Sequence, residues 1–301
     1  MAKVKVAVLG TGSLGQHHVR IYSELQQAGL VELTGVYDSH PETARKIAEK
    51  NQTRVFGSIA EAARRSDALN IVTPTTTHFE IASELLNQGK HVLVEKPMTD
   101  DSVQAGRLIE LAQQKNCVLQ VGHVERFNPV FNILQTVATE PRFIECSRLS
   151  PFPARSTDIG VVLDLMIHDL DIVLAFVKSP VTSVDGVSGP TDPCYISLDY
   201  RLQEGYITRV ARDDEEESSL LKKALTFGLG FGKDSAIVSE FAGKKIVREP
   251  VPIAKEEPLK LELQSFVACV REKQTPIVSG ESAKRALDLA FEITRQIQQM
   301  K

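Results

Sequence analysis

The chain has 301 residues, and this length predicts two domains because single hydrophobic cores tend to stop growing near about 250 residues. The composition, 42% hydrophobic and 25% charged, is typical of a globular enzyme, and the net charge of −4 argues against a nucleic-acid-binding surface. No run is apolar enough to cross a membrane, and the N-terminus enters a strand directly. We therefore expect a cytoplasmic protein whose four scattered cysteines are reduced thiols.

The opening residues predict a strand, a tight turn and a helix. Valines alternate with other residues from Val4 to Val8, and the run ends at a glycine-rich segment. Gly10 would form the turn, Gly12 would leave the backbone open to a pyrophosphate, and Gly15 would let the helix pack closely on the strand. We therefore expect a dinucleotide to bind at this segment, which consists of Gly10, Thr11, Gly12, Ser13, Leu14 and Gly15.

The helix after the turn is expected over residues 13–27, and it carries two adjacent histidines. Neighbouring helix residues point in different directions, so His17 and His18 do not form a metal pair, and we expect polar residues of the surface or the first turn. A second strand, 31–37, ends at Asp38. A carboxylate there accepts hydrogen bonds from the adenosine ribose and repels a 2′-phosphate, which predicts NAD rather than NADP.

Further strands and helices continue the alternation that is typical of a doubly wound parallel sheet. The strands are expected at 54–56, 68–72, 91–94 and 117–121, and the helices at 41–51, 58–65, 79–87 and 102–115. Strand ends in such sheets face the ligand crevice, so we predict that Thr73, Pro74 and His78 line the cofactor. His78 could instead be a helix N-terminal residue without a ligand contact.

The strand at 91–94 runs into the sequence Glu95-Lys96-Pro97. Lys96 is thus a cation at the carboxyl end of a buried strand, and the proline after it fixes the backbone and could carry a cis bond. A lone lysine is normally a solvated surface charge. One held between a strand end and a proline is a better catalytic candidate, and we predict that Glu95 and Lys96 face the cofactor.

At this point the sequence resembles the Gfo/Idh/MocA oxidoreductases, a family named for glucose–fructose oxidoreductase and inositol dehydrogenase. The resemblance rests on the glycine turn, Asp38, Glu95-Lys96-Pro97 and two later stretches, Gly122–Pro129 and Gly160–Asp171. It implies an α/β protein with an NAD-binding Rossmann domain, residues 1–122. An α+β domain with a mostly antiparallel open sheet, residues 123–301, would bind substrate and form a homodimer or homotetramer.

The second of these stretches also suggests a site from its spacing. Asp164 and His168 are four residues apart, so on a helix they share one face, and a histidine beside a carboxylate suits a general base. Two other interpretations stay open: a core histidine satisfied by its helical neighbour, and a metal site that includes Asp171. The resemblance favours catalysis without a metal, and it implies that Lys96, Asp164 and His168 bind substrate and catalyse its reaction.

The two stretches are most similar to the branch of the family that contains UDP-N-acetylglucosamine 3-dehydrogenases, which act on the way to diamino lipid A. This implies a nucleotide-sugar substrate that Arg126 and Asn128 help to bind. Arg126 and Arg148 suit a diphosphate because guanidinium forks pair with phosphate oxygens, and each could instead form a surface ion pair. The segment 179–194 is short for the family, so the second sheet is expected to be short or to lack strands.

The remaining sequence contains two loop-like segments and several predicted elements. The acidic run 213–217 is expected to be a solvated loop or helix start, and the glycine-rich run 228–233 a mobile loop rather than a phosphate loop. By resemblance, residues 195–200 belong to the second sheet. The other predicted elements are strands at 236–241 and 245–248 and amphipathic helices at 258–273 and 282–300.

Together these features predict an NAD-dependent sugar dehydrogenase. Hydride would pass from a hydroxyl-bearing ring carbon to the nicotinamide. His168, oriented by Asp164, would take the hydroxyl proton, and Lys96 would stabilise the developing alkoxide. The resemblance makes the C3 hydroxyl of UDP-N-acetylglucosamine the expected position of oxidation. Two alternatives stay open: an inositol or free-sugar dehydrogenase of the same family, and a non-catalytic NAD-binding regulatory protein, against which Lys96 and His168 argue.

Overall fold

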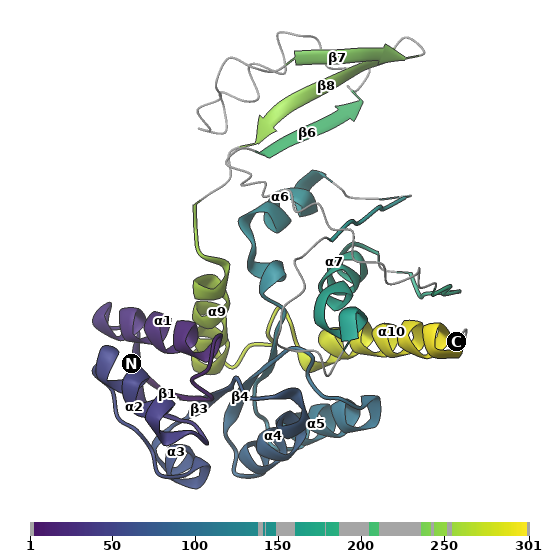
Figure 1. Cartoon of the computed structure of the whole chain (residues 1–301). Coiled ribbons are helices and arrows are strands. Elements are labelled where there is room, and N and C mark those ends of the chain that lie inside the picture. Colours follow the sequence, from purple (N-terminus) through teal and green to yellow (C-terminus); the bar gives the residue numbers. More distant parts are fainter. Residues whose placement is uncertain are drawn as a thin grey trace. The chain divides into compact units, whose positions relative to one another are not determined.

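The computed structural model describes residues 3–137, 141, 143–148, 160–177, 179–186, 205–210, 236–241, 244–251 and 255–299 (Figure 1). The chain forms two compact units, Met1–Tyr195 with Glu257–Lys301, and Ile196–Glu256. The first unit therefore joins the predicted Rossmann domain to the two C-terminal helices, and the functional division expected after residue 122 stays a prediction. No helix in the described part of the chain is long and apolar enough to cross a membrane.

A parallel sheet forms the centre of the first unit, with its strands in the order β2-β1-β3-β4-β5. The strands are β1 (Val4–Leu9), β2 (Val31–Tyr37), β3 (Ala68–Ile71), β4 (His91–Glu95) and β5 (Leu119–Gly122). Every residue of β3 and β5 is buried, as expected for a parallel sheet with both faces covered. The strand order reverses between β1 and β3, and such sheets bind ligands beyond the carboxyl ends at this switch point.

The helices that connect these strands confirm the predicted ones, with ends shifted by a residue or two. They are α1 (Gly15–Gln27), α2 (Pro41–Lys50), α3 (Ile59–Arg65), α4 (His78–Asn87) and α5 (Ser102–Gln114). Two of them begin at local caps that the sequence supplies. Ser58 Oγ accepts a hydrogen bond from the Glu61 backbone at 3.1 Å, and Asp101 Oδ1 accepts one from Gln104 at 2.8 Å.

One predicted strand is wrong. Residues 54–56 make only an isolated parallel bridge, between Val55 and Val36. Gly35 of β2 explains the difference, because a Cβ atom there would lie 2.7 Å from both the Arg54 carbonyl oxygen and the Phe56 ring. The segment lies beside Val36 of β2, whose backbone bonds to Arg54 and Phe56, and Phe56 is buried against the glycine, so the pairing is limited to one bridge.

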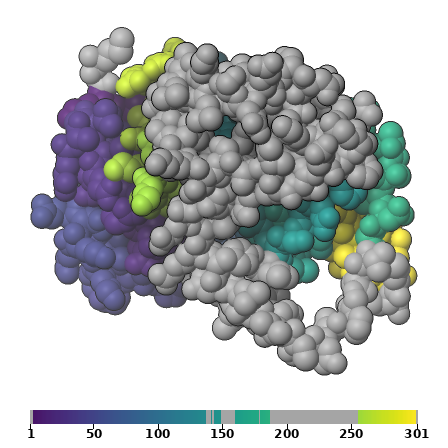
Figure 2. Space-filling model, turned by 90° about the horizontal axis from the view of Figure 1, so that it is seen from above, coloured from purple at the N-terminus to yellow at the C-terminus, as the bar shows by residue number. Residues whose placement is uncertain are grey.

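The later part of the first unit is helical. Its elements are η2 (Val124–Phe127), α6 (Pro129–Val137), η3 (Val162–Met166), α7 (Ile167–Phe176), α9 (Pro258–Glu272) and α10 (Gly280–Gln299). The predicted C-terminal helices are thus confirmed, and η3 is a π-helical turn that the sequence did not predict. Figure 2 shows the yellow-green start of α9 beside the purple N-terminal elements, where Lys260 Nζ donates to Glu24 Oε2 of α1 at 3.0 Å.

The second unit contains a small antiparallel sheet in the order β6-β8-β7. Its strands are β6 (Gly205–Val210), β7 (Ala236–Phe241) and β8 (Lys244–Val251), with Gly205 opposite Val251 and Phe241 opposite Lys244. The strands expected at 236–241 and 245–248 are confirmed, and β6 was not predicted. The expectations for 195–200, 213–217 and 228–233 fall outside the described residues, as does the second half of the segment 179–194.

One carboxyl group lies inside the core of the first unit. Glu262 of α9 is fully buried, and neither of its carboxyl oxygens has a hydrogen-bond partner among the described residues. Burial first, and then the negative charge of Glu95, hold the pKa of this group well above its usual value of 4.5. The fold therefore favours the protonated form of Glu262.

We expect the substitution E262Q to remove a pH dependence of stability. Above pH 4.5 the unfolded wild-type chain loses this proton while the folded chain keeps it, so the wild-type free energy of unfolding falls as pH rises. The fall is about 1.4 kcal/mol per pH unit until the folded pKa is reached. E262Q has no such proton. Between about pH 5 and 7, its free energy of unfolding in urea should therefore rise relative to that of the wild type by the same amount per pH unit.

The control for this experiment is E272Q, which removes a half-exposed carboxylate from the same helix. E272Q should show no such gain with pH. A difference between E262Q and wild type that stays constant with pH would contradict the prediction, because it would mean that Glu262 is ionised in the fold.

Candidate active site

The three glycines of the turn have the surroundings that their predicted roles require. Gly10 has φ = +91°, and a Cβ atom there would lie 2.2 Å from the Val72 carbonyl oxygen. A Cβ atom on Gly15 would lie 2.0 Å from the Gly10 carbonyl oxygen, so the turn and α1 pack without room for side chains. Gly12 has nothing within 4 Å of its Cβ position, so the backbone there borders open space.

Asp38 follows β2 at the same edge of the sheet. Its Oδ2 accepts hydrogen bonds from the Thr11 backbone at 2.7 Å and the Thr11 hydroxyl at 2.9 Å, and its Oδ1 accepts one from the His40 backbone at 2.8 Å. Burial opposes ionisation, but these bonds outweigh it and lower the pKa of the carboxyl group. An ionised carboxylate is thus held beside the glycine turn, with the buried Thr11 side chain as its support.

His78 joins two loops at this edge. The ring is buried, and its nitrogens lie 2.9 Å from the Thr73 carbonyl oxygen and 3.0 Å from that of Pro97. Burial lowers the pKa of the ring, although these two acceptors and the charge of Glu95 oppose the shift. Both nitrogens face the backbone, and this favours the interpretation of His78 without a ligand contact. Thr73 and the exposed Pro74 remain at the carboxyl end of β3.

Lys96 lies at the carboxyl end of β4, and its peptide bond to Pro97 is cis. The Lys96 ammonium donates to the Asp164 carbonyl oxygen at 2.6 Å and to Asp164 Oδ1 at 2.9 Å. Both side chains are about four-fifths buried, with 17% and 21% exposed. The structure therefore brings together two of the three predicted catalytic residues as an ion pair between β4 and η3.

The expected pairing of Asp164 with His168 is not the one observed. The prediction assumed an α-helix, whereas η3 is a π-helical turn whose wider winding changes the direction of Asp164 relative to His168. His168 Nδ1 has no hydrogen-bond partner among the described residues. The ring lies edge-on to His123, with 6.2 Å between centroids and 86° between planes, and His123 is a neighbour that the sequence did not identify.

The environment keeps His168 neutral. Burial, followed by the positive charges of Lys96 and Arg148, lowers the pKa of His168 to about 3. Burial, followed by the charges of His168, Lys96 and Arg126, also lowers the pKa of His123 to about 3. A neutral histidine beside a lysine ammonium can accept a proton at neutral pH.

The predicted substrate-binding residues of the second half are engaged with their own neighbours. Arg126 Nη1 lies 3.3 Å from Asp171 Oδ1, both side chains are buried, and the guanidinium stacks over the Phe131 ring at 5.0 Å. Burial raises the pKa of Asp171 to about 6 although Arg126 opposes this. Asn128 Oδ1 accepts from the Val130 backbone at 3.1 Å, so this side chain caps α6.

Arg148 is also held in ion pairs. Its Nε lies 3.0 Å from both carboxylate oxygens of Asp169, and its Nη1 lies 3.4 Å from Glu125 Oε1. This is the arrangement that the sequence left open as the alternative to diphosphate binding. The carboxylates of the alternative metal site are also paired with cations, Asp164 with Lys96 and Asp171 with Arg126. Among the described residues, no group of side chains is placed to bind a metal ion.

Comparison with known proteins identifies the family. The Gfo/Idh/MocA model, which describes an oxidoreductase family with an NAD-binding Rossmann fold, matches residues 4–123. UDP-N-acetylglucosamine 3-dehydrogenase from Acidithiobacillus ferrooxidans is 31% identical over 308 aligned residues, which cover 97% of each chain. This chain belongs to the Gfo/Idh/MocA oxidoreductase family. It is an enzyme, an NAD-dependent oxidoreductase.

A solved structure and one further relative show the range of this Gfo/Idh/MocA member's similarities. The solved structure of the A. ferrooxidans enzyme, GnnA, has a TM-score of 0.80 at 26% identity and covers 99% of this chain and 98% of its own. The scyllo-inositol 2-dehydrogenase (NAD(+)) of Bacillus subtilis is 25% identical over 97% of this chain and 93% of its own. The α/β fold with an N-terminal Rossmann sheet is therefore that of the family.

The residues of the oxidoreductase fit an NAD cofactor. The open space at Gly12 leaves backbone N–H groups at the start of α1 for a pyrophosphate, and the Asp38 carboxylate lies where ribose hydroxyls would need an acceptor. Lys96 lies at the carboxyl end of strand β4, next to β3, at the same edge of the sheet. Gly10, Gly12, Gly15 and Asp38 would thus hold the adenosine diphosphate portion.

We expect the substitution G12A to weaken NAD binding without destabilising the fold. The new methyl group meets no protein atom, but it occupies the space of the pyrophosphate, so the dissociation constant should rise by about tenfold or more. G15A is the matched comparison, since its methyl group would collide with Gly10, and it should lower the melting temperature instead. Calorimetric titration and thermal unfolding separate the two effects. Unchanged NAD affinity in G12A would contradict the prediction.

One residue of α1 is more buried than the sequence analysis suggested. His17 is exposed and His18 lies in the first turn of α1, as expected, but His18 is fully buried rather than at the surface. A signal was present, because His18 lies four residues before Tyr22 on the face of α1 that the apolar residues mark as buried.

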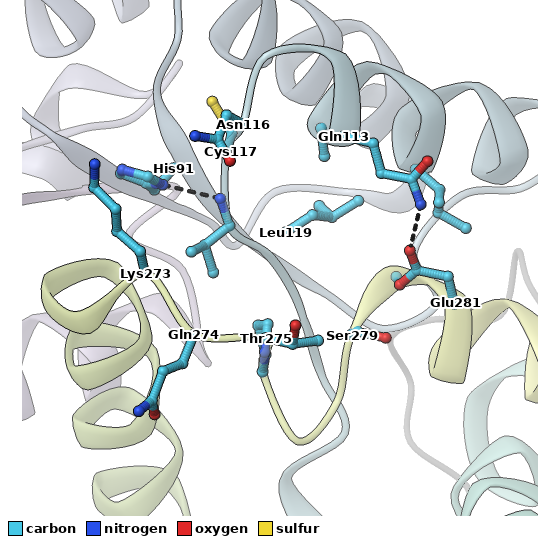
Figure 3. Close-up of a pocket in the computed structure, with 15 residues that line it drawn as sticks. His91, Gln113, Asn116, Cys117, Leu119, Lys273, Gln274, Thr275, Ser279 and Glu281 are labelled. Atoms are coloured by element: carbon cyan, nitrogen blue, oxygen red, sulfur yellow. Dashed lines mark hydrogen bonds between the residues drawn. The ribbon is translucent and has the colours of Figure 1, made fainter.

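A cavity of about 220 Å³ lies at the opposite edge of the sheet (Figure 3). His91, the first residue of β4, borders it, and His91 Nδ1 accepts a hydrogen bond from the Val118 backbone at 2.9 Å. On the other side of the cavity, Gln113 Nε2 donates a hydrogen bond to Glu281 Oε1 at 2.9 Å, so each of these two side chains has a polar partner. The cavity adjoins the amino end of β4, whereas Lys96 follows its carboxyl end, so the cavity is separate from the candidate active site.

Proposed function

We propose that this oxidoreductase is a dehydrogenase that oxidises the C3 hydroxyl of UDP-N-acetylglucosamine to a ketone. The substrate is inferred from the full-length similarity to the A. ferrooxidans enzyme, which bears that name. The observation that supports the chemistry is the Lys96–Asp164 pair beside a neutral His168. A place in lipid A synthesis, a homo-oligomeric state and a cytoplasmic location remain predictions.

In this mechanism Lys96 binds and polarises the reacting hydroxyl. An ammonium group has three N–H donors, and Asp164 takes two of them, which leaves one for the substrate oxygen. A positive charge next to the hydroxyl lowers its pKa and stabilises the alkoxide that forms. Asp164 fixes the direction of the ammonium group, so its role is the orientation of Lys96 rather than of His168.

His168 takes the hydroxyl proton. A histidine with a pKa of about 3 is a weak base, and this is sufficient only because Lys96 makes the hydroxyl more acidic. NAD, when bound, supplies the acceptor for the hydride that leaves the ring carbon. The proposed division of labour is therefore Lys96 for charge stabilisation, His168 for proton transfer and Asp164 for positioning.

A second candidate is an inositol or free-sugar dehydrogenase. The observation in its favour is that Arg126 and Arg148 are both occupied by internal carboxylates, so neither arginine presents an unpaired guanidinium to a diphosphate. The similarity to scyllo-inositol 2-dehydrogenase agrees with this alternative. A non-catalytic NAD-binding protein is disfavoured because it would not need the Lys96–Asp164 pair.

Initial rates of NADH formation test the proposal. The panel contains UDP-N-acetylglucosamine, UDP-glucose, N-acetylglucosamine, glucose and scyllo-inositol, each with NAD and with NADP. We expect turnover with UDP-N-acetylglucosamine and NAD, and its 3-deoxy analogue should inhibit without being oxidised. Turnover with scyllo-inositol alone would support the second candidate. The absence of turnover with any UDP-sugar would overturn the proposed substrate.

A further inference from the structure

A chain of polar side chains runs through the buried side of the Rossmann sheet, behind the candidate active site. It consists of Tyr22 and His18 on α1, Asn70 on β3 and Glu95 at the end of β4. Tyr22, His18 and Asn70 are fully buried, and Glu95 is 7% exposed. The mechanism above uses none of these side chains, yet burying four polar groups is costly unless they bond to one another.

The hydrogen bonds of this chain run from Tyr22 through Asn70 to His18. Burial raises the pKa of the Tyr22 hydroxyl above its usual range, so the hydroxyl keeps its proton, and it donates to Asn70 Oδ1 at 3.0 Å. Asn70 must then present its NH₂ group to His18, whose Nδ1 accepts at 3.0 Å. A ring that accepts at Nδ1 carries its proton on Nε2, and Nε2 lies 3.1 Å from Glu95 Oε1.

Glu95 connects the chain to Lys96. Its Oε2 accepts a bent hydrogen bond from the Lys96 backbone at 3.3 Å, while Oε1 faces His18. His18 Nε2 and Glu95 Oε1 are not aligned as a hydrogen bond, so their approach to 3.1 Å is a close polar contact. On the opposite side, a Cβ atom on Gly122 of β5 would lie 2.5 Å from Oε2, so the carboxylate fits only because that residue is glycine. The carboxylate is thus confined on three sides, next to the backbone of Lys96.

We propose that His18 is a positioning residue for Lys96. The Nε2–H tautomer, fixed by Tyr22 and Asn70, holds Glu95, and Glu95 in turn holds the Lys96 backbone at the end of β4. Because His18 is in the first turn of α1, the same chain ties the helix that follows the glycine turn to the strand that carries the lysine. This inference rests on the proposed function only for the catalytic role of Lys96.

The first experiment measures the tautomer and needs no substrate. The ¹⁵N spectrum of the His18 ring in the wild-type protein should show a bare Nδ1 and a protonated Nε2. N70D places a carboxylate oxygen opposite His18 Nδ1 and should move the ring proton onto Nδ1. Y22F removes the donor that fixes Asn70 Oδ1, so the Asn70 amide becomes free to rotate. A wild-type ring with its proton on Nδ1, or a spectrum that N70D does not change, would overturn the proposal.

The second experiment measures turnover in three variants. H18L removes the contact with Glu95 and should lower kcat by about 10²-fold with NAD affinity nearly unchanged, because small misplacements of a catalytic group have costs of this size. H18Q can still donate through its amide and should recover most of the loss. H91L, at the other end of β4, removes a partly buried histidine that also accepts a hydrogen bond at Nδ1, and it should keep the wild-type kcat.

The outcomes distinguish this inference from the proposed function. If the wild-type protein oxidises none of the sugars, the proposed function fails, and the ¹⁵N spectrum still decides the tautomer. If H18L keeps its kcat, or H18Q is as impaired as H18L, His18 does not position Lys96. If H18L and H91L lose activity and melting temperature together, the role is structural only, and the inference is likewise overturned.

Discussion

The substitution K96M is expected to lower kcat by about 10³-fold or more, while the dissociation constant of NAD changes by less than about threefold. The ammonium group is the only part of the side chain that contacts Asp164, and methionine keeps the length of the stem without the charge. The hydroxyl then loses its polarising donor, and His168 is too weak a base to act without it. Steady-state rates and calorimetric titration with NAD measure the two quantities.

The matched control is K90M, at the residue that precedes β4. Lys90 Nζ donates to the Ser66 carbonyl oxygen at 2.9 Å, so this substitution also removes a partly buried ammonium group with a backbone partner. K90M should keep the wild-type kcat. If K96M retains more than about a tenth of wild-type turnover, Lys96 has been assigned the wrong role.

The substitution H168N is expected to lower kcat by about 10²- to 10⁴-fold, the range that a general base contributes. The wild-type pH profile should show the environment of His168 as well. Because the pKa of His168 is lowered to about 3, kcat/KM should not fall as pH decreases through 6.5, the usual pKa of histidine. An acidic limb centred near the usual histidine value would contradict the assignment.

The cause of the lowered pKa can be checked without turnover. The charge of Lys96 lowers the pKa of His168, second only to burial, so removing that charge in K96M should raise it. An NMR titration of the His168 ring in wild type and K96M measures this shift. H17N, which alters an exposed histidine of α1, serves as the control and should leave the titration unchanged.

The parts of this protein that were predictable from sequence are those set by local interactions. Apolar runs located the strands, and the predicted helix starts at 58 and 102 lie within one residue of the observed ones, where Ser58 and Asp101 each cap a backbone group three residues away. The glycine turn was predictable because Gly10 needs a positive φ and Gly15 has no room for a side chain. These requirements act over a few residues and leave a direct trace in the sequence.

The site was less predictable because its contacts join distant residues or depend on helix type. The spacing predicted that Asp164 pairs with His168. In the structure Asp164 lies in a π-helical turn and instead accepts a hydrogen bond from Lys96, 68 residues away along the chain. Arg126 could not be matched to Asp171 from sequence, because nothing local indicates which of several carboxylates a guanidinium will meet. Pairing of charges over such separations is decided by the fold.

The return of α9 to the N-terminal elements has a consequence for how the protein is made. Leu263, Phe266 and Val267 of α9 share one buried cluster with Val4 and Val8 of β1. Residues of α1 in the same cluster follow the first strand at once, but those of α9 are synthesised more than 250 positions later. The nucleotide-binding half thus spends most of the time of translation with this apolar face only partly covered, and the cluster is completed only after nearly the whole chain has been made.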